Sequence, residues 1–421
     1  MKVSPKVSIF LSVILLMLLS ACNNSSQPNT NSNGQQPIKF GVSLSLTGDS
    51  SADGQATKQG YEVWQDYVNS HGGLLGRQVQ MDIIDDGTKT EQAHTNYEKL
   101  ISIDHVNFVV GPFNDPFTVT GAEVAARHGY AFLEGIGTSP STFKQGLKNL
   151  FAVSLSATAY LSSFDNFLLS QPAQIRPKTV AYVTSDDPFT QPQIDTAKAK
   201  LENGGIKTVF YKVFPAELTD YNPVAQQVVA ANPDVVVIGS VGLSDSAPFL
   251  QYFKQQHFNP KLIIATAGPD QGQAFIKAMN GATDGLLVPN DGWFPSVKNY
   301  QNDAFIPAYL KKYGGAPGDI ASDSVQSFST GQVLAQAITQ AKSLDNAAVM
   351  NVLRTGTFQS LQGPVKFAAD GQNSIATPFL FQWQNVSQQQ NGKTVTAQTL
   401  IPVYPPQQAQ ANVEYPKPKW S

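Results

Sequence analysis

Short apolar runs alternate with segments of helical periodicity along most of the chain. In the first half, the apolar runs predict strands at 38–46, 79–84, 106–110 and 131–133. Between them, apolar and aromatic residues recur at helical spacing and predict helices at 56–70, 91–103 and 118–127. Continuous apolar strands between helices are typical of a parallel sheet that helices cover on both faces.

The same rhythm restarts after Pro177. It predicts strands at 180–184, 209–214, 235–239 and 262–265, and helices at 191–203, 221–231 and 246–257. Further helices are expected at 303–313, 323–341 and 347–353, before closing strands at 379–383 and 394–403. We therefore predict an α/β protein with two doubly wound lobes.

Ligands of open α/β sheets bind at the carboxyl ends of the strands. The loops to inspect first therefore follow Leu46, Val110, Leu133, Thr184, Gly239 and Ala265.

The segment before the first strand has the pattern of an export signal. Lys2 and Lys6 precede an apolar stretch at 8–19, which is short for a membrane span and typical of a secretory signal peptide. Residues 19–22 (LSAC) resemble the bacterial lipobox, in which the cysteine is lipidated after cleavage. We expect a signal peptide at 1–21, a lipidated Cys22 with a disordered polar tether over 22–37, and a body held at the outer face of the cell membrane or in the periplasm. A plain signal peptide with an incidental cysteine is the alternative.

Composition and charge exclude several function classes. The 421 residues carry 28 basic and 31 acidic side chains, a net charge of −3, which gives no basic field for nucleic acid. The single cysteine excludes an intrachain disulfide and a cysteine zinc cluster. We expect no metal and no cofactor.

Catalytic motifs are also missing from the sequence. The five histidines form no H-E-x-x-H pair, and the sequence holds no G-x-S-x-G elbow and no phosphate-binding P-loop. Residues 135–137 (GIG) lack the last glycine of the dinucleotide fingerprint. We therefore expect a protein that is not an enzyme.

Several segments, taken in order, carry a family resemblance. They are IKFGVSLSLTG at 38–48, HGGLLGR at 71–77, Asp85-Asp86, Gly111-Pro112 after an apolar run, and TSP at 138–140. Together they resemble the extracytoplasmic solute-binding proteins of branched-chain amino acid type ABC importers, the leucine/isoleucine/valine-binding type, over about residues 38 to 403.

The resemblance implies the type I periplasmic-binding-protein fold, in which three hinge crossovers join two Rossmann-like lobes. The implied N-terminal lobe is 38–155 plus 289–362, the C-terminal lobe is 156–288 plus 363–405, and 406–421 form a tail. It also implies a monomer that passes a small solute to ABC permease subunits.

The resemblance also implies a set of ligand-binding residues. Asn114 or Asp115 replaces the serine that receives the ligand carboxylate in the amino acid binders, and Ile136 and Thr138 match a second polar loop. Phe189 matches an aromatic cover, and Asp270 matches the acid that pairs with the ligand ammonium.

Two further positions complete this implied set. Asp53 replaces a tyrosine of the first loop, and Trp293 lies near an expected crossover, where it would form a wall of the pocket.

Two acids do not suit an amino acid ligand. Asp115 would repel a ligand carboxylate, and Glu134 ends the fourth strand of the same lobe. Two like charges ~4 Å apart cost about 4 kcal/mol at an effective dielectric near 20. Either the pocket takes a neutral or cationic solute, or some of these acids point away from it or face water as turn residues.

Three function classes stay open on the sequence. The first is the substrate-binding component of an ABC importer for an amino acid or a related amine or amide. The second is a ligand-sensing receptor subunit of the same fold, and the third is a secreted hydrolase on a two-lobed scaffold.

Overall fold

The computed structural model describes residues 36–390 and 393–420 and separates into two units, Met1–Gln36 and Pro37–Ser421. The predicted signal peptide (1–21), Cys22 and all but the last two residues of the predicted tether lie outside the described residues. In the described ranges, no helix is long and apolar enough to span a membrane. Every element described below belongs to the second unit.

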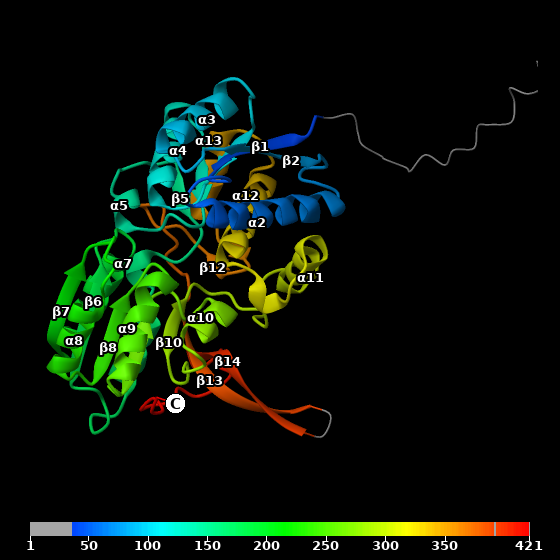
Figure 1. Cartoon of the computed structure of the whole chain (residues 1–421). Helices are drawn as coiled ribbons and strands as arrows, with labels where there is room; N and C mark the ends of the chain where they lie inside the picture. Colours follow the sequence, from blue (N-terminus) through cyan, green and yellow to red (C-terminus); the bar gives the residue numbers. More distant parts are fainter. Residues whose placement is uncertain (1–35, 391–392, 421) are drawn as a thin grey trace, which may run out of the picture. The chain divides into compact units, whose positions relative to one another are not determined.

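The first sheet is fully parallel, with the strand order β2-β1-β3-β4-β5. Its strands β1, β2 and β5 are labelled in Figure 1. Its strands are β1 (Ile38–Leu44), β2 (Val79–Asp85), β3 (Phe108–Val110), β4 (Phe132–Glu134) and β5 (Leu150–Ala152). The helices between them are α2 (Ser51–Ser70), α3 (Thr90–Ser102), α4 (Asp115–Arg127) and the short α5 (Pro140–Phe143). Apolar cores form on both faces, one around Phe40 and Trp64 on the α2 side and one around Tyr97 and Phe132 on the α3 side.

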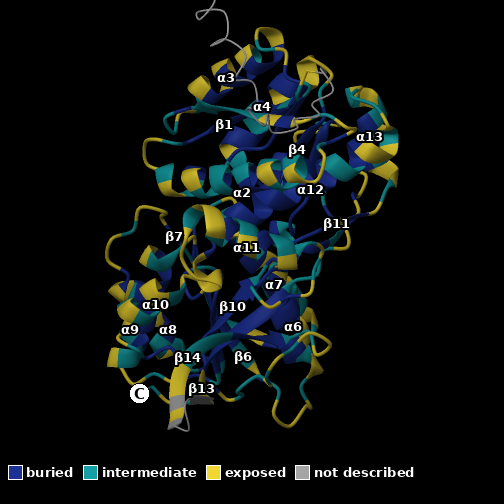
Figure 2. Ribbon diagram, turned by 90° about the vertical axis from the view of Figure 1, so that its right-hand side faces the viewer, coloured by how far each residue is buried: buried dark blue, intermediate teal, exposed yellow. Residues whose placement is uncertain are grey.

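The second sheet has the order β14-β13-β10-β9-β8-β6-β7, with antiparallel pairing only where β13 meets β10 and β14. Its strands are β6 (Thr179–Ser185), β7 (Lys207–Phe214), β8 (Val235–Gly239), β9 (Leu262–Ala265), β10 (Leu287–Asn290), β13 (Phe379–Gln390) and β14 (Lys393–Tyr404). Its helices are α6 (Ser162–Ser170), α7 (Thr190–Asn203), α8 (Asn222–Ala231), α9 (Leu243–Gln255) and α10 (Gly272–Ala278). Figure 2 shows the central strands buried and the outward helix faces exposed, as expected for sheets covered on both sides, whereas the edge strand β7 is mostly half-buried.

The chain passes between the two sheets three times. It leaves the first sheet after β5 through the turn η1 (Ala157–Ala159), returns after β10, and crosses again before β13. The segment between the last two crossings contains α11 (Asn302–Tyr313), η2 (Pro317–Asp319), α12 (Ser322–Ala341), α13 (Asn346–Thr355), β11 (Phe358–Ser360) and β12 (Gly363–Val365). Its apolar side chains, Phe328 among them, join the core of the first lobe. The predicted α/β fold with two lobes is confirmed.

The exact lobe boundaries stay a prediction. Phe367 packs edge-to-face on Phe151 of β5, with centroids 5.1 Å apart, so we propose that the third crossing follows Phe367 and not residue 362. The segment after β14 is bound to the second lobe: the Lys417 N–H donates to the Lys261 carbonyl (2.7 Å) and the Trp420 indole donates to the Phe258 carbonyl (2.6 Å). We propose that this tail is part of the second lobe.

Candidate functional site

Two acids of the first lobe bind the loop between β4 and α5. Glu134, fully buried at the end of β4, accepts the N–H groups of Ile136 (2.7 Å) and Gly137 (2.6 Å) at Oε2. Asp115, the first residue of α4, accepts the Ser139 N–H (2.9 Å) and the Thr142 hydroxyl (2.6 Å) at Oδ1. Both carboxylates are therefore used to hold this loop.

The environment of Glu134 disfavours its charge. Desolvation and the nearby Asp115 carboxylate raise the pKa of Glu134 to about 8, although the two N–H donors act in the opposite direction. Its second oxygen, Oε1, has no hydrogen-bond partner. Gly111 leaves the space for this side chain, since a Cβ there would lie 2.2 Å from the Glu134 Cβ.

Four other acids approach one another from both lobes. Asp270 follows β9 in the second lobe, Asp53 and Asp323 lie in the first turns of α2 and α12, and Asp291 follows β10 at the second crossing. We call these four side chains the cleft acids. Asp270 keeps an accessible side chain, yet protein atoms surround it so closely that desolvation is the main cause of its raised pKa. A side chain that is both accessible and surrounded lines a cleft.

The pKa shifts show that the cleft acids act on one another. Desolvation first, and then the charges of Asp53, Asp291 and Asp270, raise the pKa of Asp323 to about 8. Desolvation and Asp270 raise the pKa of Asp291 to about 6, against hydrogen bonds from the Gln326 and Gln362 amides (2.6 and 2.7 Å). Among the described residues, no Lys, Arg or His forms an ion pair with any cleft acid.

A tyrosine of the first crossing lies among these acids. Burial raises the pKa of Tyr160 well above its usual value, and the charges of Asp291, Asp270, Asp323 and Glu134 add to the effect. Its ring packs edge-to-face on Phe189, with centroids 5.1 Å apart and planes at 81°. Tyr160 and Phe189 thus form an aromatic pair beside the cleft acids.

The comparisons with known proteins decide the family. Residues 37–392 match the model of the family described as periplasmic binding protein. The chain belongs to this family.

Similar sequences and structures are consistent with that assignment. The binding protein is 23% identical to Leu/Ile/Val-binding protein homolog 7 of Brucella melitensis over 90% of its own length and 94% of the relative. A branched-chain amino acid ABC transporter structure from Silicibacter pomeroyi superposes with a TM-score of 0.77 at 19% identity, over 90% of this chain and 99% of that one.

A third similar structure contains a bound ligand. It is a branched-chain amino acid transporter substrate-binding protein of Streptococcus pneumoniae in complex with isoleucine, with a TM-score of 0.68 at 19% identity, over 87% of this chain and 100% of that one.

The binding protein is a solute-binding protein and not an enzyme, because its family consists of non-enzymatic solute-binding proteins. The proteins of this family act outside the cytoplasm.

The binding protein's predicted site residues fall into three places. Asp53 and Asp270 are cleft acids, and Phe189 adjoins them through Tyr160. Asn114, Asp115, Ile136 and Thr138 lie on the two loops that Asp115 and Glu134 hold together.

Trp293 lies in the core of the first lobe. It is 7% exposed, and its indole N–H donates to the Asn302 side chain (2.8 Å). Its ring packs edge-to-face on Phe305, with centroids 6.2 Å apart. The indole is thus satisfied inside the lobe, and we leave Trp293 out of the proposed site.

Sequence reasoning missed Asp291, Asp323 and Tyr160. Asp291 and Tyr160 lie at crossings, where no local periodicity marks them. An acid in the first turn of a helix, as Asp323 is in α12, is favoured by the helix dipole alone and gives no separate signal.

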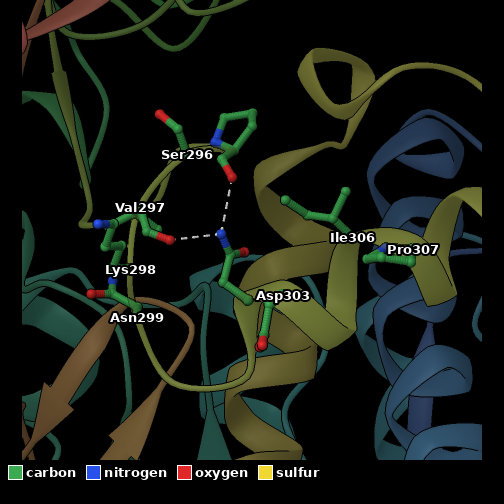
Figure 3. A pocket seen from close by; sticks show the side chains of 9 residues that line it. Ser296, Val297, Lys298, Asn299, Asp303, Ile306 and Pro307 are labelled. Carbon is green, nitrogen blue, oxygen red and sulfur yellow. Dashed lines mark hydrogen bonds between the residues drawn. The ribbon is translucent and has the colours of Figure 1, made fainter.

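A separate pocket of about 550 Å³ lies between residues 295–299 and α11 (Figure 3). The Asn302 amide donates to the carbonyls of Pro295 (3.0 Å) and Val297 (2.9 Å) at its edge. None of the predicted ligand residues and none of the cleft acids lines it. We therefore base the solute site on the cleft acids.

Proposed function

We propose that the binding protein captures a small polar solute, an amino acid or a related amine or amide, between its lobes and passes it to the permease subunits of its importer. The observation that carries this proposal is a group of acids from both lobes without a basic partner. Hydrogen bonds join the segments of Asp53, Asp323 and Asp291, and the charge of Asp270 from the second lobe acts on Asp291, Asp323 and Tyr160. Similar proteins support the amino acid class, since one of them holds isoleucine.

The cleft acids suit a solute that carries an ammonium group. Asp270 is the acid that would pair with it, because its Oδ1 has only the Gly268 N–H (2.7 Å) as partner. Tyr160 and Phe189 would cover the solute from one side. The loops of Asn114, Ile136 and Thr138 would border the site on the side of the first lobe.

Charge also links binding to closure. Without a solute, the cleft acids repel one another, which favours lobes that stand apart. A bound ammonium offsets this repulsion and interacts with acids of both lobes. A ligand shifts a conformational equilibrium only by its differential affinity for the two states, and this contact supplies it.

We further propose that the mature protein is a monomer, lipidated at Cys22 and held at the outer face of the cell membrane. The export signal and the polar segment after Cys22 support this proposal. Metabolic labelling with a radioactive fatty acid, compared between the wild type and Cys22→Ala, tests it. Incorporation that does not depend on Cys22 would contradict the anchor.

Titration calorimetry tests the site. We expect a solute from a panel of amino acids, amines and amides to bind the full chain, with its dissociation constant raised at least about thirtyfold by Asp270→Asn. Glu217→Gln is the matched control, because Glu217 is an exposed carboxyl of the same lobe outside the cleft. Equal losses in both variants, or none in Asp270→Asn, would contradict this assignment of the site.

A further inference from the structure

The loop between β4 and α5 has its backbone donors occupied. The N–H groups of Ile136 and Gly137 bind Glu134, that of Ser139 binds Asp115, and that of Thr138 donates to the Ile136 carbonyl (3.0 Å). The N-terminus of α4 would attract an anion by its dipole, but its first residue is itself the acid Asp115. The N–H groups of this loop are therefore taken up by the chain itself, while the buried Ser139 hydroxyl is left without a partner.

A buried acceptor without a donor lies beside the cleft acids. Gln326 is 7% exposed, and its amide N–H donates to Asp291. The Oε1 of Gln326 has no partner. Buried acceptors without donors are costly, and an N–H-rich ligand satisfies them.

The spacing of the acids favours an extended ligand. In the described part of the chain, no three His, Cys, Asp or Glu side chains lie close enough together to hold one metal ion. The Ser324 hydroxyl of α12 donates to the Ala56 carbonyl of α2 (2.7 Å), and the Gln326 amide donates to Asp291 (2.6 Å). Asp53, Asp323 and Asp291 therefore come from segments that lie side by side, without converging on a point. Several positive groups on one flexible molecule match this arrangement better than a single compact cation.

The charge balance agrees with this. At pH 7, Asp323 with a pKa of about 8 is mostly protonated, and Asp291 with a pKa of about 6 is mostly ionised. Asp53 and Asp270 add further carboxyl groups, and no basic side chain among the described residues pairs with the four. Two positive charges on the solute would neutralise much of the site, and an added carboxylate would restore repulsion.

We infer that the solute is a small organic cation with two or more ammonium groups and no carboxylate, a short di- or polyamine. This inference rests on the proposed function and narrows it. The relative from Streptococcus pneumoniae holds isoleucine, which carries a carboxylate. In the present chain, Glu134 and Asp115 occupy the N–H groups of Ile136, Gly137 and Ser139, which leaves fewer backbone donors for a carboxylate.

Matched pairs of probes test the inference on the full chain. Putrescine and ornithine share one diamine skeleton and differ by a carboxylate, as cadaverine and lysine do. We expect calorimetry to give each diamine a dissociation constant at least about tenfold lower than that of its amino acid, a difference of about 1.4 kcal/mol. Amino acids that bind as tightly or more tightly, leucine and isoleucine included, would overturn the inference and leave the proposed function standing. If no amine, amino acid or amide binds, both the inference and the proposed function are overturned.

A variant tests whether Asp115 makes the site reject solutes with a carboxylate, apart from any overall loss of affinity. Asp115→Ser removes one carboxylate and frees the Ser139 N–H, so we expect the affinity ratio of ornithine to putrescine to rise at least about tenfold. Glu123→Gln, an exposed acid on the same helix, should leave the ratio unchanged. Partial unfolding lowers both affinities and does not change their ratio. An unchanged ratio in Asp115→Ser, in a variant that melts cooperatively, would overturn the exclusion.

Discussion

The two groups of acids in this protein have opposite roles, although both meet near Tyr160. Glu134 and Asp115 face backbone N–H groups and hydroxyls and thereby hold a loop together. Among the cleft acids, Asp291 accepts two glutamine amides and Asp270 accepts the Gly268 N–H, yet no cation of the described residues pairs with any of the four. Acids that bind several donors of one loop hold the fold, whereas acids of both lobes that lack a cation are the ones we propose for the solute.

Removal of Glu134 should give the largest effect, because it strips two buried N–H groups of their acceptor. We expect Glu134→Ala to lower the free energy of unfolding by about 2 to 4 kcal/mol. Glu134→Gln keeps an acceptor and is uncharged, like the protonated carboxyl that a pKa of about 8 implies at pH 7, and should cost far less. Urea denaturation measures both. Equal losses would show that the hydrogen bonds to the loop are not what Glu134 contributes.

Replacement of a cleft acid should have the opposite effect: it should spare the stability of the protein and weaken binding. We expect Asp323→Asn to leave the unliganded protein about as stable as the wild type at pH 7, because Asp323, with a pKa of about 8, is already mostly uncharged there. The same change should weaken binding of putrescine by about tenfold. Melting curves with and without putrescine measure both quantities. A variant that loses stability and keeps its affinity would place Asp323 with the structural acids.

The dependence on pH should follow from the raised pKa values. A carboxyl whose pKa is higher in the folded state contributes stability below its unfolded pKa, and this contribution is lost as pH rises through the folded pKa. For Asp291 and Asp323, with pKa values of about 6 and about 8, the unliganded protein should lose stability as pH rises from 4 to 8. Their neighbours Asp53, Asp270 and Glu134 have raised pKa values and add in the same direction.

Ligand affinity should show the reverse trend. An aliphatic ammonium stays charged over this range, and more cleft carboxyls ionise as pH rises. We expect the affinity for putrescine to rise at least about fivefold from pH 6 to pH 8. Affinity that falls with pH, or unliganded stability that rises with it, would contradict the assignment of the cleft acids.

The hydroxyl of Tyr160 should have the smallest effect. Tyr160→Phe keeps the edge-to-face contact with Phe189 and removes only the group beside the acids. We expect a loss of affinity of about threefold to tenfold, typical of one hydrogen bond. Tyr160→Ala removes the ring as well and should cost more. Equal losses in the two variants would mean that the ring is not a cover for the solute.

Much of the fold could be predicted from the sequence. The helix expected at 323–341 is observed as α12 (Ser322–Ala341), and the strand expected at 235–239 is β8 itself. Missed elements were short or irregular: β5 has only three residues, and β10 (LVPN) contains Pro289, which weakens a strand pattern. Helix α6 follows a crossing and had no strand before it to mark its start.

The site was less predictable because its parts come from separate crossings. Resemblance to the family pointed to Asp53, Phe189 and Asp270, whereas Asp291 and Tyr160 reach the cleft only because the chain changes lobes. The roles of Asp115 and Glu134 depended on which N–H groups face them, which no sequence pattern reports. The number of acids can be counted from the sequence, but the N–H and hydroxyl donors that face each acid cannot be predicted from it.

Proton counting tests most directly whether the cleft acids bind a cationic solute. Putrescine is titrated into the full chain at pH 7 in two buffers of different ionisation enthalpy, and the difference in heat gives the number of protons exchanged. We expect saturable binding with a net release of protons, because the ammonium groups favour the ionised forms of Asp291 and Asp323. Binding without proton exchange, proton uptake, or no saturable binding would contradict this.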